Sequence, residues 1–362
     1  MIDRRLIQNV DWLLLVLLLL NSLVGVLVIY SASHYLPGNF YMRQLFFIGI
    51  SLMALLVLLL VDYQVLVDYA YYIYGFVMVV LAGMVVFNHL MKKGSWIRLR
   101  YFQVQPSELA KVALVLAMAR LFAEYKRSTL TRGAALAGAG LAAVPFFLVA
   151  LQPDLGTAVS LLSILAGALI LAGLERKTII AVALLVIGVG VAGWHFYLKD
   201  YQKDRLATVV FPDKDPRGSG YQVLQSKIAM GSGGVLGKGF KKGSQSQLKF
   251  LPARHTDFVF SVIGEEFGFV GAAVILIIYY AFLLRLFKSA GKARDRTGVY
   301  IVFMVGLMMA FQLIVNVAMV IGIFPVVGIP LPLLSYGGSS LLANYLGVSL
   351  VLNVKMRRFV NI

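Results

Sequence analysis

A series of long apolar blocks, separated by short polar stretches, constrains this chain more than any other feature. The blocks fall at 11–31, 44–61, 70–88, 107–122, 134–151, 156–173, 178–198, 258–287, 299–322 and 336–354. A helix needs about 20 apolar residues to cross the hydrocarbon core of a bilayer, and most blocks approach or exceed that length. Only 14% of the residues are charged, against roughly 25% in a soluble domain. We therefore expect an all-α polytopic membrane protein with about ten transmembrane helices, forming one integral membrane domain over residues 1–362.

The basic residues indicate how such a bundle would be oriented. If the N-terminus is cytoplasmic, sixteen Lys or Arg residues fall on the inside, and the short outer loops hold five: Arg43, Lys92, Lys93, Arg98 and Arg100. This distribution satisfies the positive-inside rule. Ten spans would then place both termini in the cytoplasm.

The stretch 199–257, between the predicted seventh and eighth helices, is an exception to that distribution. It holds eleven Lys or Arg residues against five Asp, and it is rich in glycine. So many glycines suit a loop that folds back over the membrane face better than a packed independent domain. The excess positive charge on the extracytoplasmic side has two readings, a binding surface for an anionic ligand or a solvated loop.

Ionisable groups at the edge of a membrane span are costly and therefore functional candidates. Five acids are predicted in the outer half of the molecule: Glu108, Asp154, Asp257, Glu265 and Glu266. Asp257 comes immediately before the eighth block, with Arg254 and His255 nearby. It either caps the helix by accepting backbone N–H groups or serves as a general base at the membrane surface. In the second reading the two basic residues bind anions or shift its pKa. Spacing alone leaves both open.

The remaining acids also have two readings each. Glu108 and Lys111 share one face of the fourth helix, which Pro106 would begin. They form either a mutually neutralising pair or part of a polar cavity in which the lysine holds a phosphate. Asp154, in the short turn before the sixth block, is either an N-cap or a cavity residue. The consecutive Glu265 and Glu266 point in different directions, so at most one is expected to share a cavity with Asp257.

Several chemistries are excluded or disfavoured. The chain has no cysteine and only four histidines, which excludes thiolate catalysis and makes a histidine-rich metal centre improbable. The stretch Ser232–Gly239 lacks the first glycine and the final Ser or Thr of a phosphate-binding loop, so no nucleotide site is expected. Three prolines and the segment Ser335–Ser340 indicate irregular backbone before the last span, which is tolerated at membrane depth only beside protein or a water-filled cavity.

Acids, cations and broken backbone are thus predicted to gather on one membrane face, as suits an amphiphile with an anionic head. Several motifs resemble the SEDS family (shape, elongation, division and sporulation) of bacterial cell-wall polymerases. They include Gln105-Pro-Ser-Glu108, Gln152-Pro-Asp-Leu-Gly-Thr157, Gly231-Ser-Gly-Gly234, His255-Thr-Asp-Phe258, Gly264-Glu-Glu266 and Pro332-Leu-Leu-Ser-Tyr-Gly-Gly-Ser-Ser340. The segment 325–332 resembles the elongation, RodA-type members better than the division members. Ala253 departs from the family, in which an acidic residue is common at that place, and this puts one accessory acid in doubt.

The resemblance implies a peptidoglycan glycosyltransferase in the bacterial cytoplasmic membrane that polymerises lipid II, the undecaprenyl-pyrophosphate-linked disaccharide-peptide, during cell elongation. It also implies a class B penicillin-binding protein as partner, in addition to membrane lipids, and no nucleic acid. Asp257 would be the catalytic base. The expected substrate-binding residues are Lys111, Glu108, Arg98, Arg100, Asp154, His255, Arg254 and Ser335.

Lysine or arginine must neutralise the leaving pyrophosphate, with a divalent cation, Mg²⁺ or Mn²⁺, as a further expectation, and no organic cofactor is needed. A transporter of lipid-linked precursors is the alternative, because polar groups and broken helices also describe a translocation path. A purely structural scaffold for the crosslinking partner is a third reading. Ionisable groups confined to one leaflet favour the enzyme.

Overall fold

The computed structural model describes residues 8–34, 36–91, 96–98, 103–124, 132–152, 154–173, 218–248 and 250–358. Its long helices are α2 (Trp12–Ser33), α3 (Phe40–Leu60), α5 (Ala70–Met91), α6 (Pro106–Glu124), α7 (Arg132–Ala150), α8 (Leu155–Ala172), α13 (Val259–Ala290), α14 (Arg296–Val320) and α15 (Gly338–Met356). Shorter elements are α4 (Tyr63–Asp68), α11 (Ser219–Ser232), α12 (Ser244–Gln247) and the strands β1 (Ile97–Arg98) and β2 (Gln103–Val104).

The helices follow the apolar blocks of the sequence closely. Seven of those described, α2, α3, α5, α7, α8, α13 and α14, are long and apolar enough to cross a membrane. Two more blocks correspond to α6 and α15, and the block 178–198 lies outside the described residues. The all-α polytopic fold is confirmed, whereas the count of ten spans stays a prediction. The two-residue antiparallel pair β1–β2 was not expected from the sequence.

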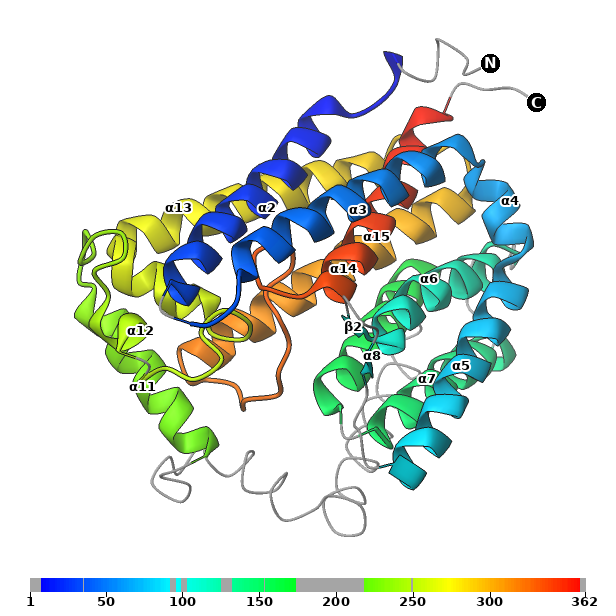
Figure 1. The fold of residues 1–362 in the computed structure, drawn as a ribbon. Helices are drawn as coiled ribbons and strands as arrows, with labels where there is room; N and C mark the ends of the chain where they lie inside the picture. Colours follow the sequence, from blue (N-terminus) through cyan, green and yellow to red (C-terminus); the bar gives the residue numbers. More distant parts are fainter. Residues whose placement is uncertain are drawn as a thin grey trace.

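Helices α14 and α15 join two groups of helices. Figure 1 shows α5, α6, α7 and α8 together on one side and α2, α3 and α13 on the other. The first of these groups contacts α14 and α15 mainly through α6 and α8. Most of α6 is buried although it carries Glu108 and Lys111, so these two charges lie inside the protein and not against lipid.

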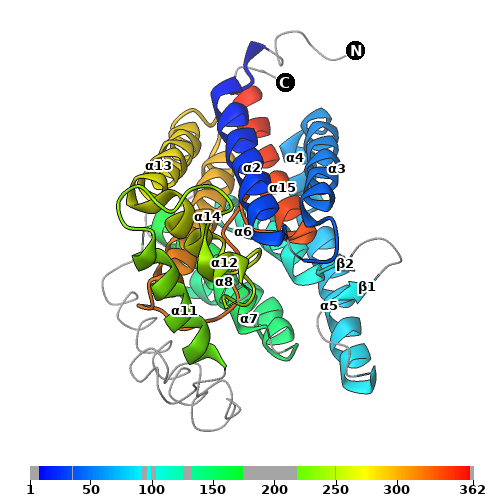
Figure 2. The ribbon, with the colours of Figure 1, turned by 60° about the vertical axis from the view of Figure 1, so that its left-hand side comes forward.

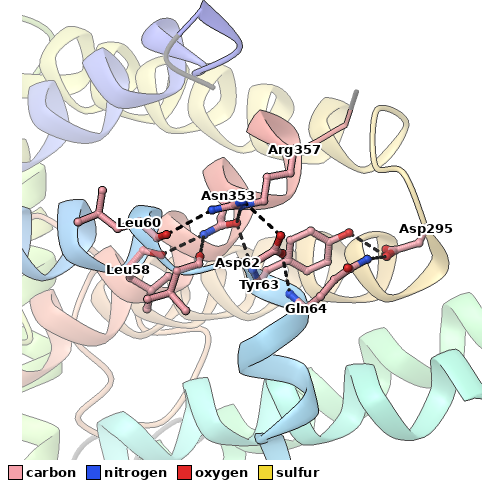
Figure 3. A network of polar contacts seen from close by, with 9 residues as sticks. Leu58, Leu60, Asp62, Tyr63, Gln64, Asp295, Asn353 and Arg357 are labelled. Carbon is pink, nitrogen blue, oxygen red and sulfur yellow. Dashed lines mark hydrogen bonds and ion pairs between the residues drawn. The ribbon is translucent and has the colours of Figure 1, made fainter. Parts of the chain in front are cut away.

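Polar clamps close one end of the bundle. Asp11, the N-cap of α2, is paired with Arg285 of α13 at 2.9 Å and with Lys355 of α15. Close by, Asn353 and Arg357 bind the turn between α3 and α4, as Figure 3 shows. The beginning of α2 and the end of α15 therefore lie together at this end, a position that Figure 2 also shows.

At the opposite end, the chain between α14 and α15 runs into the bundle. A Cβ atom on Gly25 of α2 would lie 2.7 Å from the Cα of Leu334, and one on Gly156 of α8 would lie 2.3 Å from the carbonyl oxygen of Val327. The segment 321–337 thus passes close to both helices, and only glycine allows these approaches. The irregular backbone expected here is confirmed, and its part 331–335 is buried in protein, as such backbone at membrane depth requires.

Candidate functional site

Asp257 lies in a tight turn directly before α13. The turn depends on Ala253, whose φ of +48° is uncommon for a residue with a side chain. The carbonyl oxygen of Ala253 accepts the N–H groups of Thr256, Asp257 and Phe258 at 3.1, 3.1 and 3.3 Å. Phe258 occupies the N-cap position of α13, so Asp257 precedes the cap and remains partly exposed.

Side chains from two other segments donate hydrogen bonds to backbone carbonyl oxygens of this turn. Asn316 of α14 donates to the carbonyl oxygens of Asp257 at 2.9 Å and Ile329 at 2.8 Å. The Ser335 hydroxyl donates to the carbonyl oxygen of Thr256 and accepts the N–H of Leu331. These bonds join the turn to the segment 321–337. A Cβ atom on Gly328 would lie 3.9 Å from the Asp257 carboxylate, so this part of the segment lies directly beside that carboxylate.

A second polar group lies at the N-terminal ends of α6 and α8. Glu108 and Lys111 form an ion pair at 2.7 Å with side chains 3% and 1% exposed. Asp154 accepts the backbone N–H of Thr157 at 3.1 Å as the N-cap of α8, and the Gln105 amide at 2.6 Å. The N-cap reading of Asp154 is therefore confirmed, and its place in a substrate-binding cavity stays a prediction.

The second group is electrostatically coupled. Burial raises the pKa of Asp154, the bonds from Thr157 oppose that rise, the charge of Glu108 adds to it and the charge of Lys111 opposes it. These acids and the lysine thus lie close enough to influence one another.

The segment 321–337 connects the two polar groups. On one side Gly328 adjoins the Asp257 carboxylate, and on the other Val327 is in contact with Gly156, two residues after Asp154. Ser339, at the start of α15, accepts the backbone N–H of Gln105 at 2.9 Å. The segment 321–337 therefore brings together residues from the starts of α6 and α8, from α14 and from the turn before α13.

The two basic neighbours of Asp257 are tied into the fold. Arg254 is 3% exposed, and its Nε donates to the carbonyl oxygen of Ala32 at 2.6 Å. The His255 ring packs on Phe40 at 4.7 Å and Tyr336 at 5.7 Å between ring centroids. Burial, followed by the charge of Arg254, lowers the pKa of His255. His255 is therefore held toward its neutral form, which weakens the expectation that it binds an anion.

The other expected substrate-binding residues are Arg98, Arg100 and Ser335. Arg98 belongs to β1 and pairs in register with Gln103 of β2, whose carbonyl oxygen accepts the Ser339 hydroxyl at 3.3 Å. The hairpin therefore meets the start of α15 beside the second polar group. Arg100 lies outside the described residues. Ser335 is 5% exposed, and its hydroxyl is used on main-chain atoms.

Glu265 and Glu266 do not act as a pair on one cavity. Glu265 accepts the N–H groups of Gln245 at 2.8 Å and Ser246 at 2.9 Å and is paired with Lys238 at 2.9 Å. Glu266 accepts the hydroxyl of Ser31 on α2. Both residues are fully buried. Glu265 holds the stretch after α11, and Glu266 joins α13 to α2.

No cluster of three His, Asp or Glu side chains placed to hold a metal ion occurs in the described part of the chain. Glu108 and Asp154 are two acids of the second polar group, and Lys111 already neutralises Glu108. This donor set does not fit a resident metal ion.

Asn316 and Gly328 are the residues that sequence reasoning missed. An asparagine inside an apolar block is a signal of a buried polar function in a membrane span. Its partners are 59 and 13 residues away in sequence, which no local pattern reveals.

Fold and site together define a multi-pass membrane protein with a buried polar site at one end of its bundle. Residues 11–359 match the FtsW/RodA/SpoVE family of cell cycle proteins, and the chain belongs to that family. It is 38% identical over 355 residues to the peptidoglycan glycosyltransferase MrdB of Escherichia coli K12, covering 97% of this chain and 94% of the relative.

Two solved structures share the fold. A chain of a peptidoglycan synthase complex, described for its coordination of polymerization and crosslinking, is 33% identical with a TM-score of 0.82, covering 97% of this chain and 99% of the other. The Rod shape determining protein RodA of Thermus thermophilus is 29% identical with a TM-score of 0.71, covering 97% and 98%. The RodA-type resemblance is confirmed, and the predicted peptidoglycan glycosyltransferase activity agrees with the names of these relatives.

Proposed function

We propose that this protein polymerises lipid II into glycan strands, with Asp257 as the general base. The observation that carries this proposal is the position of Asp257, whose partly exposed carboxylate lies on a turn held by main-chain bonds beside a buried polar group. A base in a transfer reaction needs a fixed position more than a large change in pKa. The clamps from Asn316 and Ser335 supply that position.

The reaction is a single displacement. Asp257 accepts the proton of the 4-hydroxyl of the acceptor's N-acetylglucosamine while that oxygen attacks the anomeric carbon of the donor's N-acetylmuramic acid. The bond from that carbon to the pyrophosphate oxygen breaks, and the electron pair leaves with the pyrophosphate. An α-linked donor becomes a β-linked chain, so one base is needed and no second nucleophilic carboxylate.

The leaving pyrophosphate requires positive charge. Lys111 is a buried cation whose charge acts on Asp154, but Glu108 already neutralises it at 2.7 Å. At least one further cation is therefore needed. Arg98 belongs to the strand pair that meets the start of α15 beside this group, and Arg100 follows it closely in sequence. A divalent cation, Mg²⁺ or Mn²⁺, would arrive with the pyrophosphate, since the donor set does not fit a resident ion.

The orientation follows from the two ends of the bundle. The start of α2 and the end of α15 meet through Asp11 and Lys355, and Asp257 belongs to the other end. With both termini in the cytoplasm, as the basic residues favour, the site faces the extracytoplasmic side of the cytoplasmic membrane. The similar chain of a synthase complex supports a class B penicillin-binding protein as the crosslinking partner.

The test uses purified protein with its crosslinking partner and labelled lipid II. Asp257→Asn keeps the size of the side chain and removes the base, so we expect polymerisation to fall by roughly 10² to 10⁴-fold with an unchanged unfolding temperature. Glu108→Gln tests the second polar group, and assays with and without a chelator test the divalent cation. Wild-type rates of glycan synthesis by Asp257→Asn would rule out the base role.

A further inference from the structure

Helix α13 is broken near its outer end. Gly268 has φ +64° and ψ −161°, which no helical residue adopts. The continuous part, 269–290, rises about 33 Å at ~1.5 Å per residue, enough to cross the hydrocarbon core alone. If the part 269–290 is the spanning part, the break lies at the membrane surface, and the part 259–267, which follows the Asp257 turn, lies at or above that surface.

The loop 233–239, which we term the glycine loop, fills the break. Four backbone hydrogen bonds of 2.9 to 3.1 Å join them: Phe269 N–H to Gly234, Val270 N–H to Val235, Lys238 N–H to Glu265 and Gly239 N–H to Glu266. A Cβ atom on Gly237 would lie 2.2 Å from the Glu266 carbonyl oxygen. The glycine loop is therefore fixed at the depth of the break.

Apolar side chains at this depth point away from the protein. Val235 is 66% exposed and Leu236 is 80% exposed. Their backbone is bonded beside Phe269, which is 72% exposed and begins the apolar stripe of α13 that includes Ile277 at 64%. The exposed tip of the glycine loop is thus continuous with a helix surface that faces lipid.

Basic and aromatic residues follow the tip directly. The Lys241 ammonium lies 3.9 Å from the centre of the Tyr30 ring at the outer part of α2, and Phe240 packs on Phe267 at 6.2 Å. Lys242 is exposed. Lysine and tyrosine beside apolar side chains are typical of the level of lipid head groups.

We propose that the glycine loop is a membrane anchor. Val235, Leu236 and Phe240 insert into the leaflet nearest the Asp257 end, and Lys241 and Lys242 contact phospholipid phosphates. The anchor fixes the part 259–267 of α13 against the bilayer surface. It thereby sets the height of the Asp257 turn, which is continuous with that part of the helix.

The absence of cysteine from the chain allows a direct test. A nitroxide is attached to Leu236→Cys, and the full-length protein is reconstituted in phosphatidylcholine–phosphatidylglycerol bilayers. Collision with oxygen, which partitions into lipid, is compared with collision with a water-soluble nickel chelate. Ile277→Cys is the matched reference for lipid, and Lys242→Cys is the reference for the head-group level.

We expect the nitroxide at position 236 to be less accessible to the nickel chelate and more accessible to oxygen than the nitroxide at position 242. Both accessibilities should approach those of the lipid reference at position 277. Val235→Cys gives the same comparison if Leu236→Cys does not fold. Accessibility to nickel greater than at 242 would overturn the proposal. So would a label that is shielded from both reagents only after a crosslinking partner is added, because the tip would then be a protein contact. Neither readout depends on catalytic activity.

Discussion

Replacing Asn316 with leucine separates the positioning of Asp257 from its chemistry. Asn316→Leu removes two donors, at 2.9 Å from the Asp257 carbonyl oxygen and 2.8 Å from that of Ile329, while keeping the volume of the buried side chain. The Asp257 carboxylate itself is unchanged. The variant should therefore retain the base but hold it less firmly.

The size of the effect follows from the two bonds. Each contributes about 0.5–1.5 kcal/mol net, so their loss costs about 1–3 kcal/mol. If all of that free energy is lost from the positioned turn, polymerisation falls roughly 5- to 150-fold, since about 1.4 kcal/mol corresponds to a factor of ten. This loss is smaller than the loss expected for Asp257→Asn.

The assay is steady-state lipid II polymerisation, with the effect expected on kcat more than on KM. Gln312→Leu is the matched control: Gln312 lies one turn away on α14, is 1% exposed, and its amide oxygen has no partner among the described residues. Its replacement should leave both activity and stability near wild type. An Asn316→Leu enzyme as active as wild type, or a Gln312→Leu enzyme equally impaired, would refute the reasoning.

Three further predictions concern stability, measured by unfolding in detergent. Lys111→Met leaves Glu108 buried without its partner and should destabilise by about 3–5 kcal/mol, with most of it recovered by adding Glu108→Gln; no recovery would contradict the ion pair. Gly268→Ala should cost about 1–2 kcal/mol from its backbone conformation alone, plus a Cβ contact of 2.3 Å with the glycine loop. Gly75→Ala is the control, because a Cβ atom there meets open space, and it should raise stability by about 0.5–1 kcal/mol. Equal changes in stability for the two variants would count against packing of the glycine loop on Gly268. Burial lowers the pKa of His255 in the folded protein. Below the ordinary histidine pKa of about 6.5, the unfolded chain therefore binds more protons than the folded protein. Stability should be full above that pH and fall below it, and His255→Gln should flatten this dependence relative to wild type.

Local patterns predicted much of this structure. The block 11–31 corresponds to Trp12–Ser33 and the block 299–322 to Arg296–Val320, because the membrane requires long apolar helices whatever the tertiary contacts. The i, i+3 spacing of Glu108 and Lys111 predicted their ion pair, and Pro106 does begin α6.

Long-range contacts were not predictable in the same way. Glu265 and Glu266 looked like candidates for a cavity because acids are costly in a helix, yet their partners come from the loop after α11 and from α2. Arg254 was predicted as an anion ligand from its place beside Asp257, and its bond to the end of α2 was not foreseen; the anion-binding role stays a prediction. These roles depend on bonds between segments far apart in sequence, which spacing along a single helix does not encode.

The hydrogen bonds that hold the Asp257 turn have a consequence for how sequences of this family can diverge. They grip peptide oxygens at positions 256 and 257, atoms that every amino acid carries. A mutation that changes a neighbouring side chain, as at Ala253, therefore leaves these two main-chain hydrogen bonds in place. Substitutions around the turn can therefore accumulate while the backbone position of Asp257 is kept.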